Sequence, residues 1–78
     1  MHNRKIKDVY ATVAEKPSPG GYAFAVVIRY EDGTKGQEVL NRDLRDCLIY
    51  GNGVIGGLMA MGADIPCNVV FDPRFERT

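Results

Sequence analysis

The fold is decided by the stretch Gly20-Gly21-Tyr22-Ala23-Phe24-Ala25-Val26-Val27-Ile28-Arg29-Tyr30-Glu31-Asp32-Gly33, which carries the clearest strand and turn pattern of the chain. In an extended chain, alternate side chains point to opposite faces. One face of this stretch then carries Tyr22, Phe24, Val26, Ile28 and Tyr30, and the other carries Ala23, Ala25, Val27 and Arg29. The alternation predicts a strand from Tyr22 to Glu31 with one heavily buried face.

The turn that follows this strand is Asp32-Gly33. Asp-Gly is favoured in the two-residue type I′ hairpin turn, in which both residues take positive φ. We therefore expect an antiparallel partner strand over residues 34–40, weakened by Gly36.

Strand residue types also occur at both ends of the chain. Residues 5–14 place Val9, Ala11 and Val13 on one face and predict a first strand. Two prolines and two glycines in residues 15–21 predict a loop. Residues 67–72 predict a short fourth strand, which ends before Pro73.

A helix is expected between the third and fourth strands. Asn41 is a good N-cap for a helix that opens at Arg42, and Asp64-Ile65-Pro66 ends it. The apolar or small residues at helical spacing are Leu44, Cys47, Leu48, Gly51, Ile55, Leu58 and Gly62. Four glycines, at positions 51, 53, 56 and 57, each cost up to about 1 kcal/mol in a helix. Either the helix breaks near residues 50–53, or the glycines let another backbone approach closely.

Composition indicates one small domain, residues 1–78, with frayed ends at 1–4 and 74–78. Ten Lys and Arg balance ten Asp and Glu, which argues against a nucleic-acid binder that relies on bulk charge. Cys47, Cys67 and a single His are too few for a disulfide framework or a four-ligand zinc site, so we expect both cysteines to be buried. No stretch is apolar enough to span a membrane, and we expect a cytoplasmic protein.

The order β-β-β-α-β, with Pro17-Ser18-Pro19-Gly20-Gly21-Tyr22-Ala23 leading into a strand that ends Ile28-Arg29-Tyr30, resembles the N-terminal half of the ribonuclease H-like fold. The resemblance implies an α+β domain. Three strands would form an antiparallel meander, one helix would pack on the sheet, and a short fourth strand would lie at its edge.

Enzymes of that family hold two divalent metals with carboxylates, which clamp the reacting oxygens of a phosphodiester. Here Tyr10 or Thr12 takes the place of the acid expected in the first strand, and residues 47–63 contain no carboxylate. Only Asp72, at the end of the fourth strand, matches a family ligand position. The resemblance therefore implies an inactive half of the fold, with no catalytic residue, bound metal or cofactor.

A competing motif is Gly51-Asn52-Gly53-Val54-Ile55-Gly56, which has the G-x-G-x-x-G spacing of dinucleotide-binding loops. Such a loop must join a strand to a helix, so that amides at the helix N-terminus meet the pyrophosphate. Little chain remains for that helix, and we favour close packing as the reason for the glycines.

The function that these observations predict is a small, non-catalytic binding or regulatory protein that acts through protein contacts. The interface candidates are Gly53, Gly56, Gly57, Tyr50 and Arg29, and a homodimer is expected. Three alternatives stay open: a phage or mobile-element inhibitor of a host defence complex of the anti-CRISPR type, a nucleic-acid-binding relative or a nuclease assembled in trans, and nucleotide binding through residues 51–56.

Overall fold

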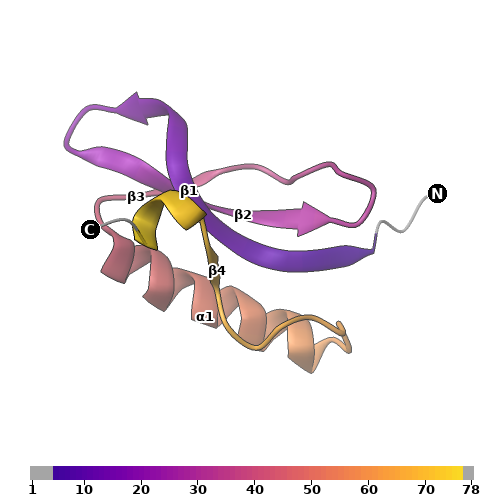
Figure 1. Cartoon of the computed structure of the whole chain (residues 1–78). Coiled ribbons are helices and arrows are strands. Elements are labelled where there is room, and N and C mark those ends of the chain that lie inside the picture. Colours follow the sequence, from indigo (N-terminus) through magenta and orange to yellow (C-terminus); the bar gives the residue numbers. More distant parts are fainter. Residues whose placement is uncertain (1–4, 77–78) are drawn as a thin grey trace.

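A computed structural model describes residues 5–76 and shows an α+β domain, in which one helix lies on one face of a four-stranded sheet (Figure 1). The elements are β1 (Ile6–Ser18), β2 (Tyr22–Tyr30), β3 (Val39–Asn41), α1 (Leu44–Ala60), β4 (Val70–Phe71) and the 3-10 helix η1 (Pro73–Glu76). The strand order is β3-β2-β1-β4, with β1, β2 and β3 antiparallel and β4 parallel to β1. The predicted fold class is confirmed.

The alternation in β2 places its large side chains against α1, as predicted. Phe24, Val26 and Ile28 all belong to the core or pack against it. The fully buried core side chains with the largest volume are Val9 of β1 and Cys47 of α1. The core therefore lies between α1 and the two long central strands.

Two residues on the opposite face of β2 are buried as well. Ala25 and Val27 are 0% and 2% exposed, although α1 lies on the other side of the sheet. The register puts Thr12 and Tyr10 of β1 directly opposite them, and Leu40 of β3 on the other side of Ala25. Directly opposed side chains in an antiparallel pair lie close enough to contact each other.

The hairpin turn after β2 differs from the predicted type I′ turn. Gly33 alone has a positive φ, and its N–H bonds to the carbonyl of Tyr30 at 3.1 Å. The Tyr30 N–H in turn bonds to the Thr34 carbonyl. This is a three-residue loop that closes on a left-handed glycine. The Asp32 side chain accepts hydrogen bonds from Thr34, which stabilises the turn without a left-handed Asp32.

The third strand is shorter than the predicted residues 34–40. Lys35 forms an isolated bridge to Arg29, and regular pairing begins only at Val39. Gly36 lies between these two points, and its N–H bonds to the Ile28 carbonyl. The chain therefore follows β2 closely through an irregular segment.

The first strand, in contrast, runs past its predicted end at residue 14. It continues through Pro17 to Ser18, with a register shift between Val13 and Ser18. A proline fits there because the shifted segment has no ladder partner that would need its missing donor. Only the turn itself, at Gly20 and Gly21 with φ near +89° and +85°, is a loop.

The helix begins two residues later than predicted and is continuous. Asp43, and not Asn41, is the N-cap, and it accepts a hydrogen bond from the Asp46 N–H at 2.8 Å. At the other end, Gly62 has φ +94°, and the Ala63 N–H bonds to the Leu58 carbonyl. This Schellman motif ends the helix before the predicted Pro66.

The C-terminal segment, which was expected to fray from residue 74, forms the 3-10 helix η1 over Pro73–Glu76. The fourth strand has only two residues instead of the predicted 67–72, and η1 follows it. The Phe75 ring lies 5.8 Å from Phe24 and 6.5 Å from Phe71, in edge-on contacts that close one end of the core. Positions 1–4, 77 and 78, also expected to fray, lie outside the described residues. Neither helix within residues 5–76 is long and apolar enough to cross a membrane.

Candidate functional site

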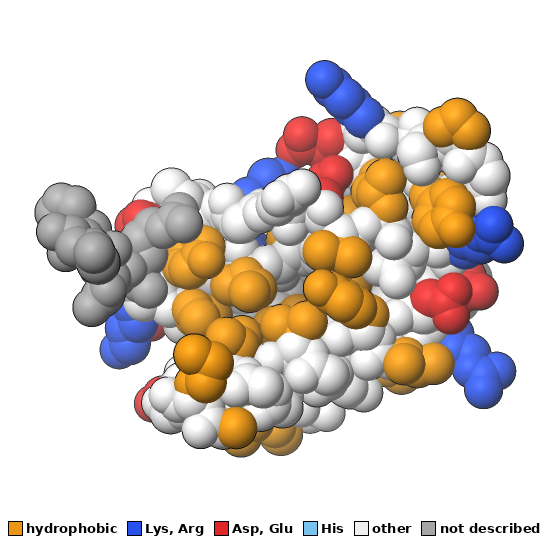
Figure 2. Space-filling model, turned by 180° about the vertical axis from the view of Figure 1, so that it is seen from behind, with side chains coloured by type: hydrophobic (Ala, Val, Ile, Leu, Met, Phe, Trp, Pro, Cys, Tyr) orange, Lys and Arg blue, Asp and Glu red, His pale blue; other side chains and the backbone are white. Residues whose placement is uncertain are grey.

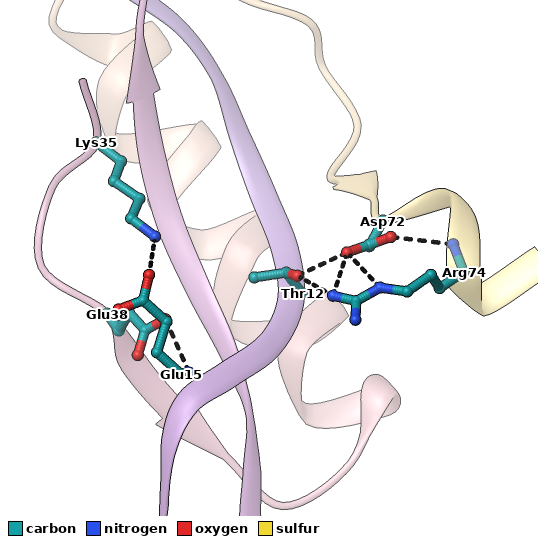
Figure 3. A network of polar contacts seen from close by, with 6 residues as sticks. All are labelled: Thr12, Glu15, Lys35, Glu38, Asp72 and Arg74. Atoms are coloured by element: carbon teal, nitrogen blue, oxygen red, sulfur yellow. Dashed lines mark hydrogen bonds and ion pairs between the residues drawn. The ribbon is translucent and has the colours of Figure 1, made fainter. Parts of the chain in front are cut away.

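The fold brings together Asp72, which the resemblance places at a metal-ligand position, and Thr12, one of the two residues considered for the first-strand position (Figure 3). Thr12 Oγ1 donates a hydrogen bond to Asp72 Oδ2 at 2.8 Å. Arg74, from η1, donates from Nη2 and Nε to the same oxygen at 2.8 and 3.1 Å. The Arg74 N–H bonds to the other carboxylate oxygen at 3.0 Å. A guanidinium of the chain itself therefore neutralises Asp72.

These contacts change the pKa of the Asp72 carboxyl. The hydrogen bonds from Arg74, together with that from Thr12, hold the pKa of the Asp72 carboxyl well below its usual range. The carboxyl is ionised at neutral pH, but its side chain is only 11% exposed. Among residues 5–76 no cluster of three acidic, His or Cys side chains is placed to hold a metal. Asp72, Arg74 and Thr12 together form a hydrogen-bonded ion pair.

Tyr10, the other residue considered for the first-strand position, belongs to a second polar cluster on the same strand. Arg29 lies over the Tyr10 ring, with its guanidinium carbon 3.9 Å from the ring centroid. Arg29 also donates two hydrogen bonds to Asp8, at 2.7 and 2.6 Å, and the Asp8 side chain is only 6% exposed. The face of the sheet that carries Arg29 is opposite to α1. Arg29 is thus separate from the other interface candidates.

A third polar cluster lies at the surface and consists of Glu15, Lys35 and Glu38 (Figure 3). Lys35 Nζ is 2.6 Å from Glu15 Oε1, and Glu38 accepts a longer hydrogen bond from the Glu15 N–H. The exposed pair lowers the pKa of Glu15 and raises that of Lys35, mainly through their hydrogen bond. Exposed ion pairs of this kind contribute little to stability. The cluster links the extended end of β1 to the segment before β3.

The helix glycines fall into two groups. A Cβ on Gly51 would lie 2.5 Å from Val69 Cγ2, so this glycine lets the segment before β4 approach α1. A Cβ on Gly53, Gly56 or Gly57 would meet no described atom within 4 Å. Packing within the chain therefore explains Gly51, whereas the close approach of a second helix at Gly53, Gly56 and Gly57, expected for a homodimer, stays a prediction.

The same helix bears on the nucleotide alternative. Residues 51–56 lie in the interior of α1, where amides bond to carbonyls of the preceding turn. A pyrophosphate site needs free amides at a helix N-terminus. The geometry does not place this G-x-G-x-x-G motif at such an end.

The open glycines belong to the solvent side of α1, which we call the outer face and define by Ile49, Gly53, Gly56, Gly57 and Ala60. All five residues are exposed, and Ile49 is 62% exposed. Positions 49, 53 and 57 follow each other at intervals of four and so form one row along the helix. Tyr50, the remaining interface candidate, lines a small hollow together with Val39 of β3.

Sequence reasoning missed an apolar hollow at the C-terminal end of α1. It measures about 600 Å³ and lies beside Ile6, Leu58, Met61 and Ala63. Hydrophobic side chains form a band between the helix and the sheet in the view from behind (Figure 2). The sequence did contain an indication of this apolar surface. Apolar side chains recur at helical spacing along one side of the helix, at Tyr50, Val54, Leu58 and Met61.

Comparison of the chain with protein-family models, curated proteins and solved structures gives no match.

Proposed function

We propose that this chain is a small, non-catalytic protein-binding domain and that the outer face of α1 contacts the partner. The observation that carries this proposal is the row of open glycines, Gly53, Gly56 and Gly57, beside the exposed Ile49. A face without Cβ atoms lets a partner backbone approach more closely than an ordinary helix surface allows.

The energetics support a binding role for these glycines. Each glycine in a helix interior costs roughly 0.8–1 kcal/mol relative to alanine. No described atom of the chain fills the space beside the three, so packing inside the domain does not offset the cost. A domain of this size has little stability to spare. Close contact with another protein gives the glycines a purpose.

The surroundings of Asp72 support the non-catalytic part of the proposal. Asp72 is the single carboxylate among the three residues Thr12, Asp72 and Arg74, and the Arg74 guanidinium donates two hydrogen bonds to its Oδ2. A two-metal phosphoryl-transfer site needs several carboxylate oxygens around both metals. This cluster therefore has the chemistry of a fold-stabilising ion pair.

The charge distribution favours a protein partner over nucleic acid. The chain has no net charge, and Arg29 and Arg74 are each engaged by a buried aspartate. Nucleic-acid binding draws on several free cations that replace counterions along the phosphate backbone. We further propose that the domain binds its partner in the cytoplasm.

The element order supports the resemblance to the first half of a ribonuclease H-like fold. A phage or mobile-element inhibitor of a host defence complex, of the anti-CRISPR type, fits the small size and the ion-paired Asp72. The nucleic-acid-binding or in-trans nuclease alternative would require carboxylates from a second chain beside Asp72.

The test is capture of partners from the native host with three forms of the chain. Gly56→Leu fills the outer face, and Lys16→Leu adds the same side chain at an exposed position of β1. We expect the unmodified chain and Lys16→Leu to retain the same protein, and Gly56→Leu to lose it. Equal capture by all three forms, or by none, contradicts the proposal.

A further inference from the structure

We infer that a second copy of this chain covers the apolar hollow at the C-terminal end of α1, in a two-fold symmetric contact. The hollow lies outside the outer face of α1, so this inference does not depend on the function proposed above. The argument rests on the shape of the hollow, the exposure of one methionine and two charges at the rim.

The hollow opens onto the edge of the core. Ile6, Leu58 and Ala63 line it, and all three are partly buried residues that pack against core side chains. Their remaining exposed surface is apolar. Covering such surface is favourable by about 25 cal/mol for each Å² removed from water.

Met61 supplies a side chain that fits such a hollow. It stands at the rim and is 85% exposed, the largest exposure among the large hydrophobic residues of the described chain. An unbranched methionine adapts to irregular apolar surfaces. Because Met61 and the hollow lie side by side, a two-fold axis between them places Met61 of each copy in the hollow of the other. A symmetric dimer requires this self-complementarity, in which one patch carries both parts.

The rim charges select a second copy over an unrelated apolar partner. Lys5 and Asp64 both border the hollow and carry opposite charges. In a two-fold contact, Lys5 of each copy faces Asp64 of the partner subunit. Lys5 has only a loose pairing with Glu31, at 3.8 Å with both side chains more than half exposed, so it is available for this contact.

A contact with a second copy has to extend beyond the hollow itself to reach the size of a stable dimer interface. A standard interface buries about 800 Å² per partner, roughly one seventh of the 5522 Å² surface of this chain. Tyr50 and Val54, on the same side of α1 as Met61, line a smaller hollow together with Val39 of β3. The whole band, from Val39 to Met61, is available to the second copy.

The test uses charge reversal and measures mass by sedimentation or light scattering over a concentration series. Lys5→Glu gives the rim two negative charges, and Asp64→Lys gives it two positive charges. We expect the unmodified chain to dimerise and each variant alone to dimerise on the order of tenfold more weakly, because like charges then face each other. An equimolar mixture of the two variants restores the dimer, since opposite charges again meet at both contacts.

Two further variants locate the contact. Met61→Glu should abolish the dimer and leave the domain folded, because Met61 is exposed. Lys16→Glu, a charge reversal in β1 far from the hollow, should leave the dimer intact. Thermal unfolding followed by circular dichroism checks that each variant is folded. A monomer at high micromolar concentration, or a dimer that tolerates both charge reversals and Met61→Glu, overturns the inference. A dimer broken by Gly56→Leu but kept in Met61→Glu overturns it too, and moves the second copy to the outer face of α1.

Discussion

Thr12 Oγ1 lies 2.8 Å from Asp72 Oδ2, and this hydrogen bond joins residues that are 60 positions apart in the sequence. The Asp72 N–H also bonds to the Ala11 carbonyl at 2.9 Å, next to the two-residue parallel pairing of β4 with β1. So short a strand gives few ladder bonds of its own. Asp72 therefore anchors the C-terminal segment to the central sheet through both its backbone and its side chain.

Replacing Asp72 should reduce stability in a pH-dependent manner. The pKa of Asp72 in the folded chain lies well below its ordinary value of about 3.9. A lowered folded-state pKa stabilises the fold fully above the unfolded-state pKa, and this stabilisation is lost as the pH falls toward the folded-state value. We expect Asp72→Asn to lower the urea midpoint at pH 7, and the difference from the unmodified chain to shrink below about pH 4.

Glu15→Gln is the matched control, because Glu15 also pairs with a cation but is exposed. Its effect on the urea midpoint should be smaller at every pH. An Asp72→Asn difference that stays constant between neutral and acidic pH would contradict the assignment of the anchoring role to the ionised carboxylate.

Alanine substitutions should separate the four helix glycines. Gly53→Ala, Gly56→Ala and Gly57→Ala should each raise the free energy of unfolding by up to about 1 kcal/mol, because their Cβ atoms meet open space. Gly51→Ala should lower it, because the new Cβ would overlap Val69. Urea unfolding of the four variants measures this. A uniform change across all four would show that Gly51 is not a packing position.

The two cysteines should differ in reactivity, contrary to the prediction that both are buried. Burial, reinforced by Asp43 and Asp46, raises the pKa of Cys47 to about 11, whereas Cys67 is exposed. A thiol reagent should modify one cysteine in the folded chain and both after denaturation, because the thiolate is the reactive form. Cys67→Ser should remove the reaction of the folded chain. Rapid modification of Cys47 in that variant would contradict its burial.

Nuclease activity should be absent from the isolated chain. Incubation with an RNA/DNA hybrid and Mg²⁺ or Mn²⁺ is the measurement, and we expect no cleavage because one ion-paired carboxylate does not bind two metals. Asp72→Ala serves as the control for a contaminating enzyme. Cleavage that disappears in Asp72→Ala would show that this position is catalytic.

Local sequence patterns determined most of the architecture. The alternation in residues 22–30 identified the central strand and the face that packs against α1, and Phe24, Val26 and Ile28 confirm it. The strand period of two residues and the helix period of 3.6 residues depend on the geometry of the chain itself, so neighbouring residues suffice to reveal them. The α+β order of elements was predictable for the same reason.

Tertiary structure decided the features that involve residues distant in sequence. The hydrogen bond of Thr12 to Asp72, the edge-on contact of Phe75 with Phe24 and the close approach of Val69 to Gly51 all depend on how the C-terminal segment packs against the sheet and α1. Helix and turn boundaries shifted because competing caps and turns, such as Asn41 and Asp43, have similar local preferences. The local free energies of the competing caps differ by less than the free energy of the packing contacts, so packing selects the cap that is used.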